Sequence, residues 1–195
     1  MTADDLLGLK LPHVTTRGQL DEVEQANVAQ GLRWLARPRR GNILDDAFVR
    51  TLHRRLFGDV WSWAGTYRLS ETNIGIAPHE IATQLRVLLD NARTSCAESV
   101  YPPLEAAVRL HHRMVQIHPF PNGNGRHARI AADEFLKRYC DHPPIEWASG
   151  YDLQRDSARR DAYLHALRRA DAGDFEALLE FVGEGAAGES AKADG

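Results

Sequence analysis

The chain has 195 residues, of which 43% are hydrophobic and 26% charged, and its formal net charge is −3. These values are typical of a globular protein, and the slight acidity gives no sign of a nucleic-acid partner. No apolar run approaches the roughly 18 residues that cross a membrane, and the acidic N-terminus leads into no apolar signal segment. We therefore expect a cytoplasmic protein without nucleic-acid or membrane partners, of unknown oligomeric state.

Apolar residues recur at helical spacing along most of the chain, which predicts an all-α protein. Prolines and glycines stand at positions where helices commonly begin or end. The predicted helices span Gln19–Leu35, Leu44–Phe57, a run that begins at Pro78, Leu104–Ile117, Asn124–Tyr139, Tyr151–Ala170 and Phe175–Val182.

One segment, Tyr67–Ala77, does not follow the helical pattern. Apolar and polar residues alternate there around a glycine, which predicts a short β-hairpin or an extended flap. The sequence therefore predicts a helical bundle with one small hairpin. The residues of the predicted flap are Thr72, Asn73, Ile74, Gly75 and Ile76.

The length suits one domain. The C-terminal end is rich in Gly, Ala and Ser without an apolar stripe, so it is predicted to be disordered. Cys96 and Cys140 are far apart in sequence and make no metal-binding pattern, which predicts free thiols in a reducing compartment. The predicted boundaries are 1–183 for the domain, 1–43 for a helical extension, 44–181 for the core and 184–195 for the tail.

The segment His118–Arg129 places several reactive groups between two predicted helices. Its Gly-Asn-Gly turn at 123–125 opens the second helix, whose N-terminus offers free N–H groups and a positive dipole end to a phosphate. The two glycines allow consecutive N–H groups to converge on an anion. Arg126 and Arg129 lie three residues apart on that helix and can both reach one phosphate chain. With His118 as a candidate general base, the segment predicts polyphosphate chemistry.

This segment resembles the active-site loop of the Fic family, whose pattern is H-x-F-x-[D/E]-G-N-G-R-x-x-R. The stretch Trp63–Arg68, which reads Trp-Ala-Gly-x-Tyr-Arg, agrees with the same family, and the resemblance covers about Leu44–Phe181. Residues Thr15–Gly18 and Glu22–Asn27 also resemble a bacterial subgroup called mobile mystery protein B. The seven matching positions of the eight in the pattern are His118, Phe120, Gly123, Asn124, Gly125, Arg126 and Arg129.

The resemblance implies a Fic-type helical bundle with the hairpin flap beside the active-site loop. It implies an enzyme that transfers AMP from ATP to a hydroxyl side chain of a target protein and releases pyrophosphate. His118 would be the general base, and Phe120 would anchor the loop in the core. The implied phosphate ligands are the backbone around Gly123–Gly125 and the side chains of Asn124, Arg126 and Arg129.

Asn122 stands where the family has Asp or Glu to bind Mg²⁺. An amide oxygen can ligate a hard cation, but without charge it does so more weakly than a carboxylate. We therefore expect Mg²⁺ to accompany ATP, held by Asn122 or mainly by the phosphates of the nucleotide. The change also leaves an alternative open, in which the chain is an inactive or differently specific Fic-fold module that binds a nucleotide or a partner protein.

The resemblance implies two further contacts. The flap over Ser70–Ala77 would pair with the target by strand addition, with a purely structural hairpin as the alternative. Many Fic proteins are inhibited by a helix with the pattern [S/T]-x-x-x-E-[G/N], whose Glu pairs with the arginine matching Arg129. The nearest stretch is Leu20–Gln25, where Glu24, or less directly Glu22, could make that pair. Both carboxylates could instead face solvent, which would leave inhibition to an antitoxin-like partner.

Three further histidines, His111, His112 and His127, lie near the loop in sequence. They could belong to a metal cluster, but no cysteine or carboxylate has a compatible spacing. The favoured interpretation is that these histidines are surface or packing residues.

Overall fold

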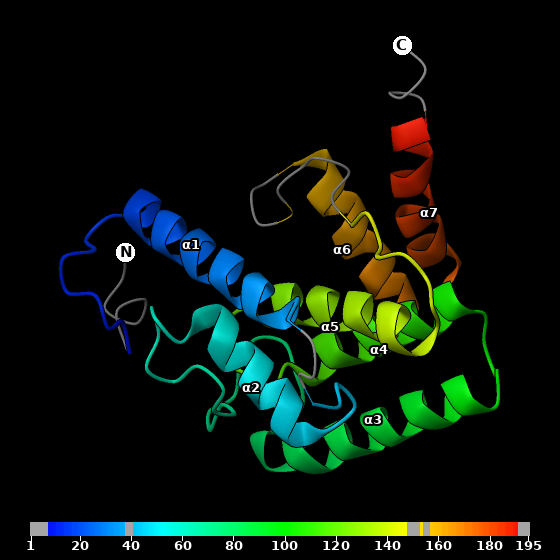
Figure 1. Ribbon diagram of the computed structural model, residues 1–195, viewed down its shortest axis with the longest axis horizontal. Helices are drawn as coiled ribbons and strands as arrows, with labels where there is room; N and C mark the ends of the chain where they lie inside the picture. Colours follow the sequence, from blue (N-terminus) through cyan, green and yellow to red (C-terminus); the bar gives the residue numbers. More distant parts are fainter. Residues whose placement is uncertain (1–7, 38–40, 148–152, 154–156, 191–195) are drawn as a thin grey trace. The chain divides into compact units, whose positions relative to one another are not determined.

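A computed structural model describes residues 8–37, 41–147, 153 and 157–190 of the chain (Figure 1). In this part of the chain the regular structure is helical, apart from an isolated antiparallel bridge between Leu9 and Trp61. The prediction of an all-α protein is confirmed. The helices are α1 (Arg17–Leu35), α2 (Asp46–Phe57), the 3₁₀ helix η2 (Pro78–Glu80), α3 (Ile81–Ala97), α4 (Pro103–Ile117), α5 (Asn124–Tyr139), α6 (Ala158–Asp171) and α7 (Glu176–Ser190).

The two C-terminal helices differ from their predicted bounds. Helix α6 begins at Ala158, where the Ser157 side chain accepts a hydrogen bond from the Arg160 backbone N–H, and not at Tyr151. Most of 148–156 lies outside the described residues. Helix α7 continues to Ser190, into the segment predicted to be disordered. Its alanines and glutamates favour helix, and this preference outweighs the interspersed glycines. Residues 191–195 lie outside the described chain.

Contacts divide the chain into two compact units. The first unit comprises Met1–Asn91 and Met114–His127, and the second comprises Ala92–Arg113 and Ala128–Gly195. Each unit therefore combines stretches that are distant in sequence, and α3, α4 and α5 each supply residues to both. The predicted loop up to His127 belongs to the first unit. The prediction that one domain ends at 183 stays a prediction.

In the first unit, α1 packs against α2 (Figure 1). Gly31 permits the close approach, because a Cβ atom there would lie 2.7 Å from the carbonyl oxygen of Arg55. One turn earlier, the Asn27 side chain donates to the same carbonyl at 3.3 Å and accepts from the Asp59 backbone N–H at 2.9 Å. These contacts fix α1 on α2. Glu24, one turn before Asn27 on the same buried face, is therefore held in place as well.

The buried face of α1 differs from the apolar stripe that the sequence suggests. The residues it buries are Leu20, Glu24, Asn27, Gly31 and Leu35. Val23 and Val28 are only half-buried, and the side chain of Leu32 is 43% exposed. The buried face therefore carries a carboxylate and an amide, which apolar periodicity cannot reveal.

The predicted hairpin over Tyr67–Ala77 does not form; this segment contains no β-strand and is an irregular loop. The Thr72 hydroxyl donates to the Ile74 carbonyl, which closes a local turn in place of cross-strand pairing. Gly75 has φ +113°, a conformation that interrupts an extended strand. Apolar and polar residues do alternate in this segment, but the Thr72 hydrogen bond and the Gly75 conformation determine its backbone. We call residues 70–77 the flap loop.

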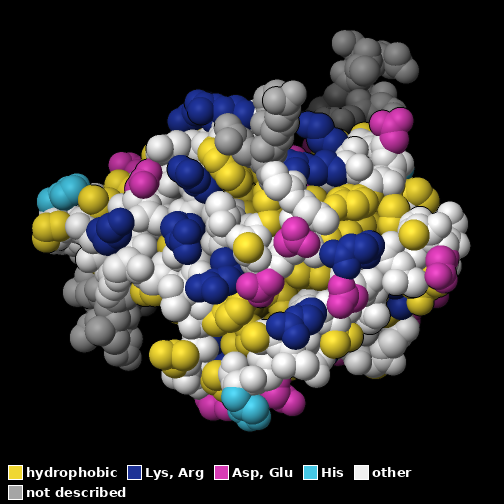
Figure 2. All heavy atoms as spheres, turned by 60° about the horizontal axis from the view of Figure 1, so that its bottom comes forward, with side chains coloured by type: hydrophobic (Ala, Val, Ile, Leu, Met, Phe, Trp, Pro, Cys, Tyr) yellow, Lys and Arg dark blue, Asp and Glu magenta, His cyan; other side chains and the backbone are white. Residues whose placement is uncertain are grey.

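None of the described helices is long and apolar enough to cross a membrane. On the face drawn in Figure 2, Lys and Arg side chains lie among acidic and hydrophobic ones and are spread over the surface. The expectations of a cytoplasmic location and of no nucleic-acid partner remain predictions.

Candidate active site

The loop between α4 and α5 is held by its own side chains. Phe120 is fully buried, and its ring stacks on that of His53 with centroids 3.7 Å apart. The Asn124 side chain accepts from the Phe120 N–H at 2.9 Å and donates to the Phe120 carbonyl at 2.7 Å. The predicted role of Phe120 as loop anchor matches this geometry. The Asn124 side chain, in contrast, braces the loop, where the resemblance implied a phosphate ligand.

His53 on α2 ties the loop to the turn that follows α2. Its Nδ1 accepts a hydrogen bond from the Gly65 backbone N–H at 3.0 Å, so its Nε2 carries the proton and donates to the Asn122 carbonyl, also at 3.0 Å. Burial, followed by the His127 side chain, holds the pKa of His53 well below its usual range. A neutral ring with one fixed tautomer therefore positions the middle of the loop.

Arg68 holds both ends of the flap loop and the start of the active-site loop. Its buried guanidinium donates to the carbonyls of Ser70, at 3.0 Å, and of Ile76. It also donates to the carbonyls of His118, at 2.7 Å, and of Ile117, at 3.4 Å. The Arg68 backbone N–H reaches a further carbonyl in the same loop, that of Pro119, at 3.0 Å. One side chain thus sets the position of the flap loop relative to His118.

His118 is half-buried at the end of α4, with φ +52°. This left-handed backbone turns the chain out of the helix and is uncommon for a residue with a side chain. Burial and then the positive charge of Arg68 lower the pKa of His118. The ring is therefore neutral at neutral pH and has a nitrogen lone pair with which to accept a proton.

The predicted anion site lies at the first turn of α5. Gly123 precedes it with φ +77°, and a Cβ atom there would lie 2.7 Å from the Phe57 ring, so only glycine fits. The N–H groups of Asn124, Gly125 and Arg126 come before the first intrahelical hydrogen bond, which His127 makes to the Gly123 carbonyl at 3.0 Å. These N–H groups are suited to bind phosphate oxygens.

Arg126 is paired with Glu24. Its guanidinium lies 2.6 Å from Oε2 of Glu24 and 4.7 Å from the centroid of the Phe57 ring. The other carboxylate oxygen, Oε1, accepts from the Trp61 indole N–H at 2.7 Å. The Arg126 and Glu24 side chains are only 14% and 9% exposed, so this is a buried, charge-assisted contact. Arg126, a side chain suited to bind phosphate, is therefore already in an ion pair with Glu24 of the same unit.

The ion pair of Glu24 in the structure differs from the predicted inhibitory contact, which stays a prediction. The resemblance implied a pair between Glu24 and Arg129, but the ion pair that the structure gives Glu24 is to Arg126. Arg129 belongs to the second unit, where its guanidinium lies 5.7 Å from the centroid of the Tyr163 ring. Of the two carboxylates considered, Glu22 is exposed and Glu24 is buried. The alternative with both on a solvent face is therefore wrong for Glu24.

The residues present do not fit a magnesium ion held by the protein. The Asn122 Oδ1 accepts the Gly123 N–H at 2.7 Å, and this amide carries no charge. Within the described residues there is no group of three His, Cys, Asp or Glu side chains that could hold a metal. The segment from His118 to Gly123 therefore offers Mg²⁺ no carboxylate ligand.

The other histidines near the loop have packing roles. In the first unit, His127 is buried and bonds to the Val49 carbonyl at 3.0 Å, and burial lowers its pKa to about 4. In the second unit, His111 bonds to the Tyr163 hydroxyl and His112 to Asp171, each at 2.9 Å. All three are buried, so the surface alternative is wrong and the packing interpretation holds.

The sequence did not identify three residues that support the site, His53, Arg68 and Trp61. Arg68 ends the stretch Trp63–Arg68 that carries part of the family resemblance, so a signal for it was present. His53 had no comparable signal, because a lone histidine in a helical pattern looks like a core residue. Trp61 lies in the stretch Trp61–Trp63, where nothing in the sequence indicates a bond to Glu24.

The Fic/DOC family model matches residues 43–136 of the chain. The chain is 31% identical over 144 residues to the "Protein adenylyltransferase Fic" of Nematostella vectensis, which covers 71% of this chain and 31% of that protein. It is 28% identical over 141 residues to the protein of the same name from Drosophila melanogaster, covering 70% and 27%. The chain thus spans less than a third of the length of these curated relatives.

Solved structures of Fic proteins superimpose on this chain. Fic-1 from C. elegans superimposes with a TM-score of 0.69 at 22% identity, covering 98% of this chain and 58% of that one. The BepC protein of Bartonella tribocorum, solved with bound AMPPNP, gives a TM-score of 0.66 at 16% identity, covering 87% of each chain. At these identities the comparison shows the fold.

Removing the Arg68 charge is expected to raise the pKa of His118, because a neighbouring cation disfavours protonation of the ring. An NMR titration of the His118 ring would compare wild type with Arg68→Met, which has no charge, and Arg68→Lys, which keeps the charge without the planar fork. The pKa should rise in Arg68→Met and stay low in Arg68→Lys. Identical titrations for wild type and Arg68→Met would leave burial as the sole cause of the shift.

Proposed function

Because the chain belongs to the Fic/DOC family, we propose that it is a protein adenylyltransferase, which moves AMP from ATP to a hydroxyl side chain of a target protein. One observation carries the proposal. His118, whose pKa is lowered by burial and by Arg68, follows α4, and a short loop leads from it to the N-terminus of α5, whose first turn bears an arginine and N–H groups outside the intrahelical hydrogen bonds. The name of the curated relatives, protein adenylyltransferase Fic, supports the same activity.

In the proposed reaction the target hydroxyl oxygen attacks the α-phosphorus of ATP. The bond from that phosphorus to the oxygen shared with the β-phosphate breaks, and pyrophosphate leaves with the electron pair. Nε2 of His118 takes the hydroxyl proton as the new bond forms, because Nδ1 is buried. The N–H groups at the start of α5 stabilise the charge that develops on the α-phosphate oxygens.

The arginines supply the remaining phosphate contacts in this proposal. Arg126 would bind the chain of phosphates once its pair with Glu24 opens, since a guanidinium cannot serve both anions fully. The resemblance gives Arg129, three residues later on α5, a matching role. Mg²⁺ would arrive with the nucleotide, held mainly by phosphate oxygens, because Asn122 is a poor ligand for it.

The flap loop would receive the target segment. Arg68 holds the carbonyls of Ser70 and Ile76, the two ends of the loop, and Ile74 between them is 53% exposed. An extended target segment could add its backbone hydrogen bonds along this loop and present its hydroxyl to His118. The loop is not a preformed strand, so the target would order it on binding.

A second candidate function is a Fic-fold module that binds a nucleotide or a partner without transfer. Two observations favour it, the uncharged Asn122 and the occupied Arg126. A partner protein that holds the Glu24 pair closed would act as the antitoxin-like inhibitor. Incubation with ATP labelled at the α-phosphate separates the two functions, because only the transferase leaves label on protein.

His118→Ala is expected to lower AMP transfer by about 10²–10⁴-fold, because that is the usual contribution of a general base. ATP binding, measured by calorimetry, should change little, since the ring itself holds no phosphate in this proposal. Transfer is measured as α-label on the protein and on lysate proteins. Undiminished labelling by His118→Ala would contradict the proposed role of His118.

Opening the Glu24–Arg126 pair is expected to raise transfer. Glu24→Gln removes the charge and keeps an acceptor for Trp61, so self-labelling should rise about tenfold or more, since a hydrogen bond between charged groups contributes about 1.5–3 kcal/mol. Glu24→Gly should have at least the same effect. Glu22→Gly is the matched control, because Glu22 lies on the same helix and is exposed.

Equal labelling by wild type, Glu24→Gln and Glu24→Gly would rule out α1 as an inhibitory element. Inhibition, where present, would then come from a separate partner. A rise with Glu22→Gly as large as that with Glu24→Gln would point to a general loosening of α1 instead of the ion pair.

A further inference from the structure

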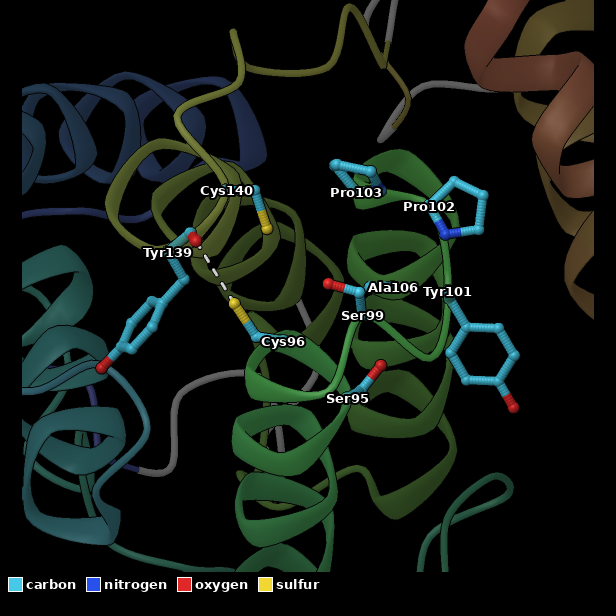
Figure 3. Close-up of a pocket in the computed structure, with 9 residues that line it drawn as sticks. All are labelled: Ser95, Cys96, Ser99, Tyr101, Pro102, Pro103, Ala106, Tyr139 and Cys140. Atoms are coloured by element: carbon cyan, nitrogen blue, oxygen red, sulfur yellow. Dashed lines mark hydrogen bonds between the residues drawn. The ribbon is translucent and has the colours of Figure 1, made fainter.

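Two thiols that are distant in sequence meet in the second unit. Cys96 lies near the end of α3, and Cys140 directly follows α5. Figure 3 shows the two side chains pointing toward one another, with the Cys96 thiol bonded to the Tyr139 carbonyl at 3.2 Å. Both cysteines are half-buried and neither is in a disulfide. Their proximity is a property of the fold, since the sequence separates them widely.

The thiols line a groove of about 520 Å³ that is open to solvent. Tyr101, Pro102 and Ser99 lie across the groove from them (Figure 3). A small oxidant or a thiol reagent can therefore reach the pair without unfolding of the unit. Nothing in the proposed transfer reaction uses this groove.

The two thiols lie close enough for Cys96 to affect the pKa of Cys140. Burial, and then the charge and hydrogen bond of Cys96, raise the pKa of Cys140 to about 11. Cys140 is therefore a protonated thiol at neutral pH, and a poor first nucleophile. If one thiol reacts, its partner is already within hydrogen-bonding reach to complete a second step.

We propose that Cys96 and Cys140 are a site of reversible oxidation, at which a hydroperoxide or a small disulfide converts the two thiols into an intramolecular disulfide. Cys96 reacts first and Cys140 resolves the intermediate. The product joins the end of α3 to the end of α5 within the second unit. The inference is independent of the proposed AMP transfer, because its readout is thiol chemistry.

With a hydroperoxide such as hydrogen peroxide, the Cys96 sulfur attacks one peroxide oxygen and the O–O bond breaks. The departing hydroxide takes the thiol proton and leaves as water, with Cys96 now a sulfenic acid. The Cys140 sulfur then attacks the Cys96 sulfur, the S–O bond breaks, and the second hydroxide takes the Cys140 proton. Two thiols lose two electrons, and one peroxide is reduced to two waters.

With a small disulfide such as oxidised glutathione, the sulfur of the Cys96 thiol attacks one sulfur, the S–S bond of glutathione breaks, and one glutathione thiolate leaves. Cys140 then displaces the second glutathione from the mixed disulfide, and each leaving thiolate takes up the proton of the attacking thiol. Both routes give the same protein product, and separate arms of one experiment distinguish them.

The test treats folded wild type, Cys96→Ser and Cys140→Ser with hydrogen peroxide or with oxidised glutathione. Each sample is then quenched, unfolded and alkylated for mass spectrometry. Wild type should lose both alkylatable thiols, become lighter by two hydrogen atoms, stay monomeric on a non-reducing gel and regain both thiols with dithiothreitol. Cys140→Ser should stop at a Cys96 sulfenic acid that dimedone traps, or at a glutathione adduct. Cys96→Ser should keep its thiol.

Phenylarsine oxide gives a second measurement that needs no oxidant, because trivalent arsenic bridges two neighbouring thiols. It should bind wild type with one equivalent per chain and bind neither serine variant tightly. Retention of both thiols in oxidised wild type, chains linked to one another as the main product, or equal arsenical binding by all three proteins would overturn the proposal.

Discussion

The buried guanidinium of Arg68 is the interaction on which the candidate site depends most directly. Its hydrogen bonds in the described structure run to carbonyl oxygens of the flap loop and of Ile117 and His118. Carbonyl oxygens satisfy the donors but do not cancel the charge, and a buried charge without such bonds would cost several kcal/mol. The positive field therefore remains, and it acts on the ring of His118. The same side chain therefore positions the loop and adds to the effect of burial in lowering the pKa of His118.

The ion pair between Glu24 and Arg126 lies in the first turn of α5, and its contribution to stability is small. A buried ion pair is weak evidence for stability, because desolvation of both ions offsets most of their attraction. Here the carboxylate is also bonded to Trp61, and α1 is fixed on α2 through Gly31. The fold thus maintains a costly polar contact in the first turn of α5, where the proposed function places the phosphates of the nucleotide. This arrangement is easier to understand as control of the site than as a source of stability.

The sequence predicted the helices up to α5 and the loop that precedes α5, because these features are local. Apolar spacing locates helices, and the density of the motif around His118 identifies the loop. The buried face of α1 could not be predicted, since Glu24 and Asn27 become buried only through partners on distant segments. The flap loop was predicted as a hairpin because Thr72, Ile74 and Ile76 alternate. In the structure Arg68 donates to the carbonyls of Ser70 and Ile76 in place of a neighbouring strand. No local sequence pattern predicts these two hydrogen bonds.

Under the proposed function, the attachment of α1 to α2 would make Glu24 an intramolecular competitor of the nucleotide phosphates. A group tethered to the same chain acts at a fixed effective concentration, in the millimolar range for flexible short linkers and higher for a docked helix. Its strength is therefore set by how firmly the helix is docked, through the contacts of Asn27 and Gly31, as much as by the ion pair itself. A molecule that holds α1 away from α2 would raise the apparent affinity for nucleotide without touching the phosphate site.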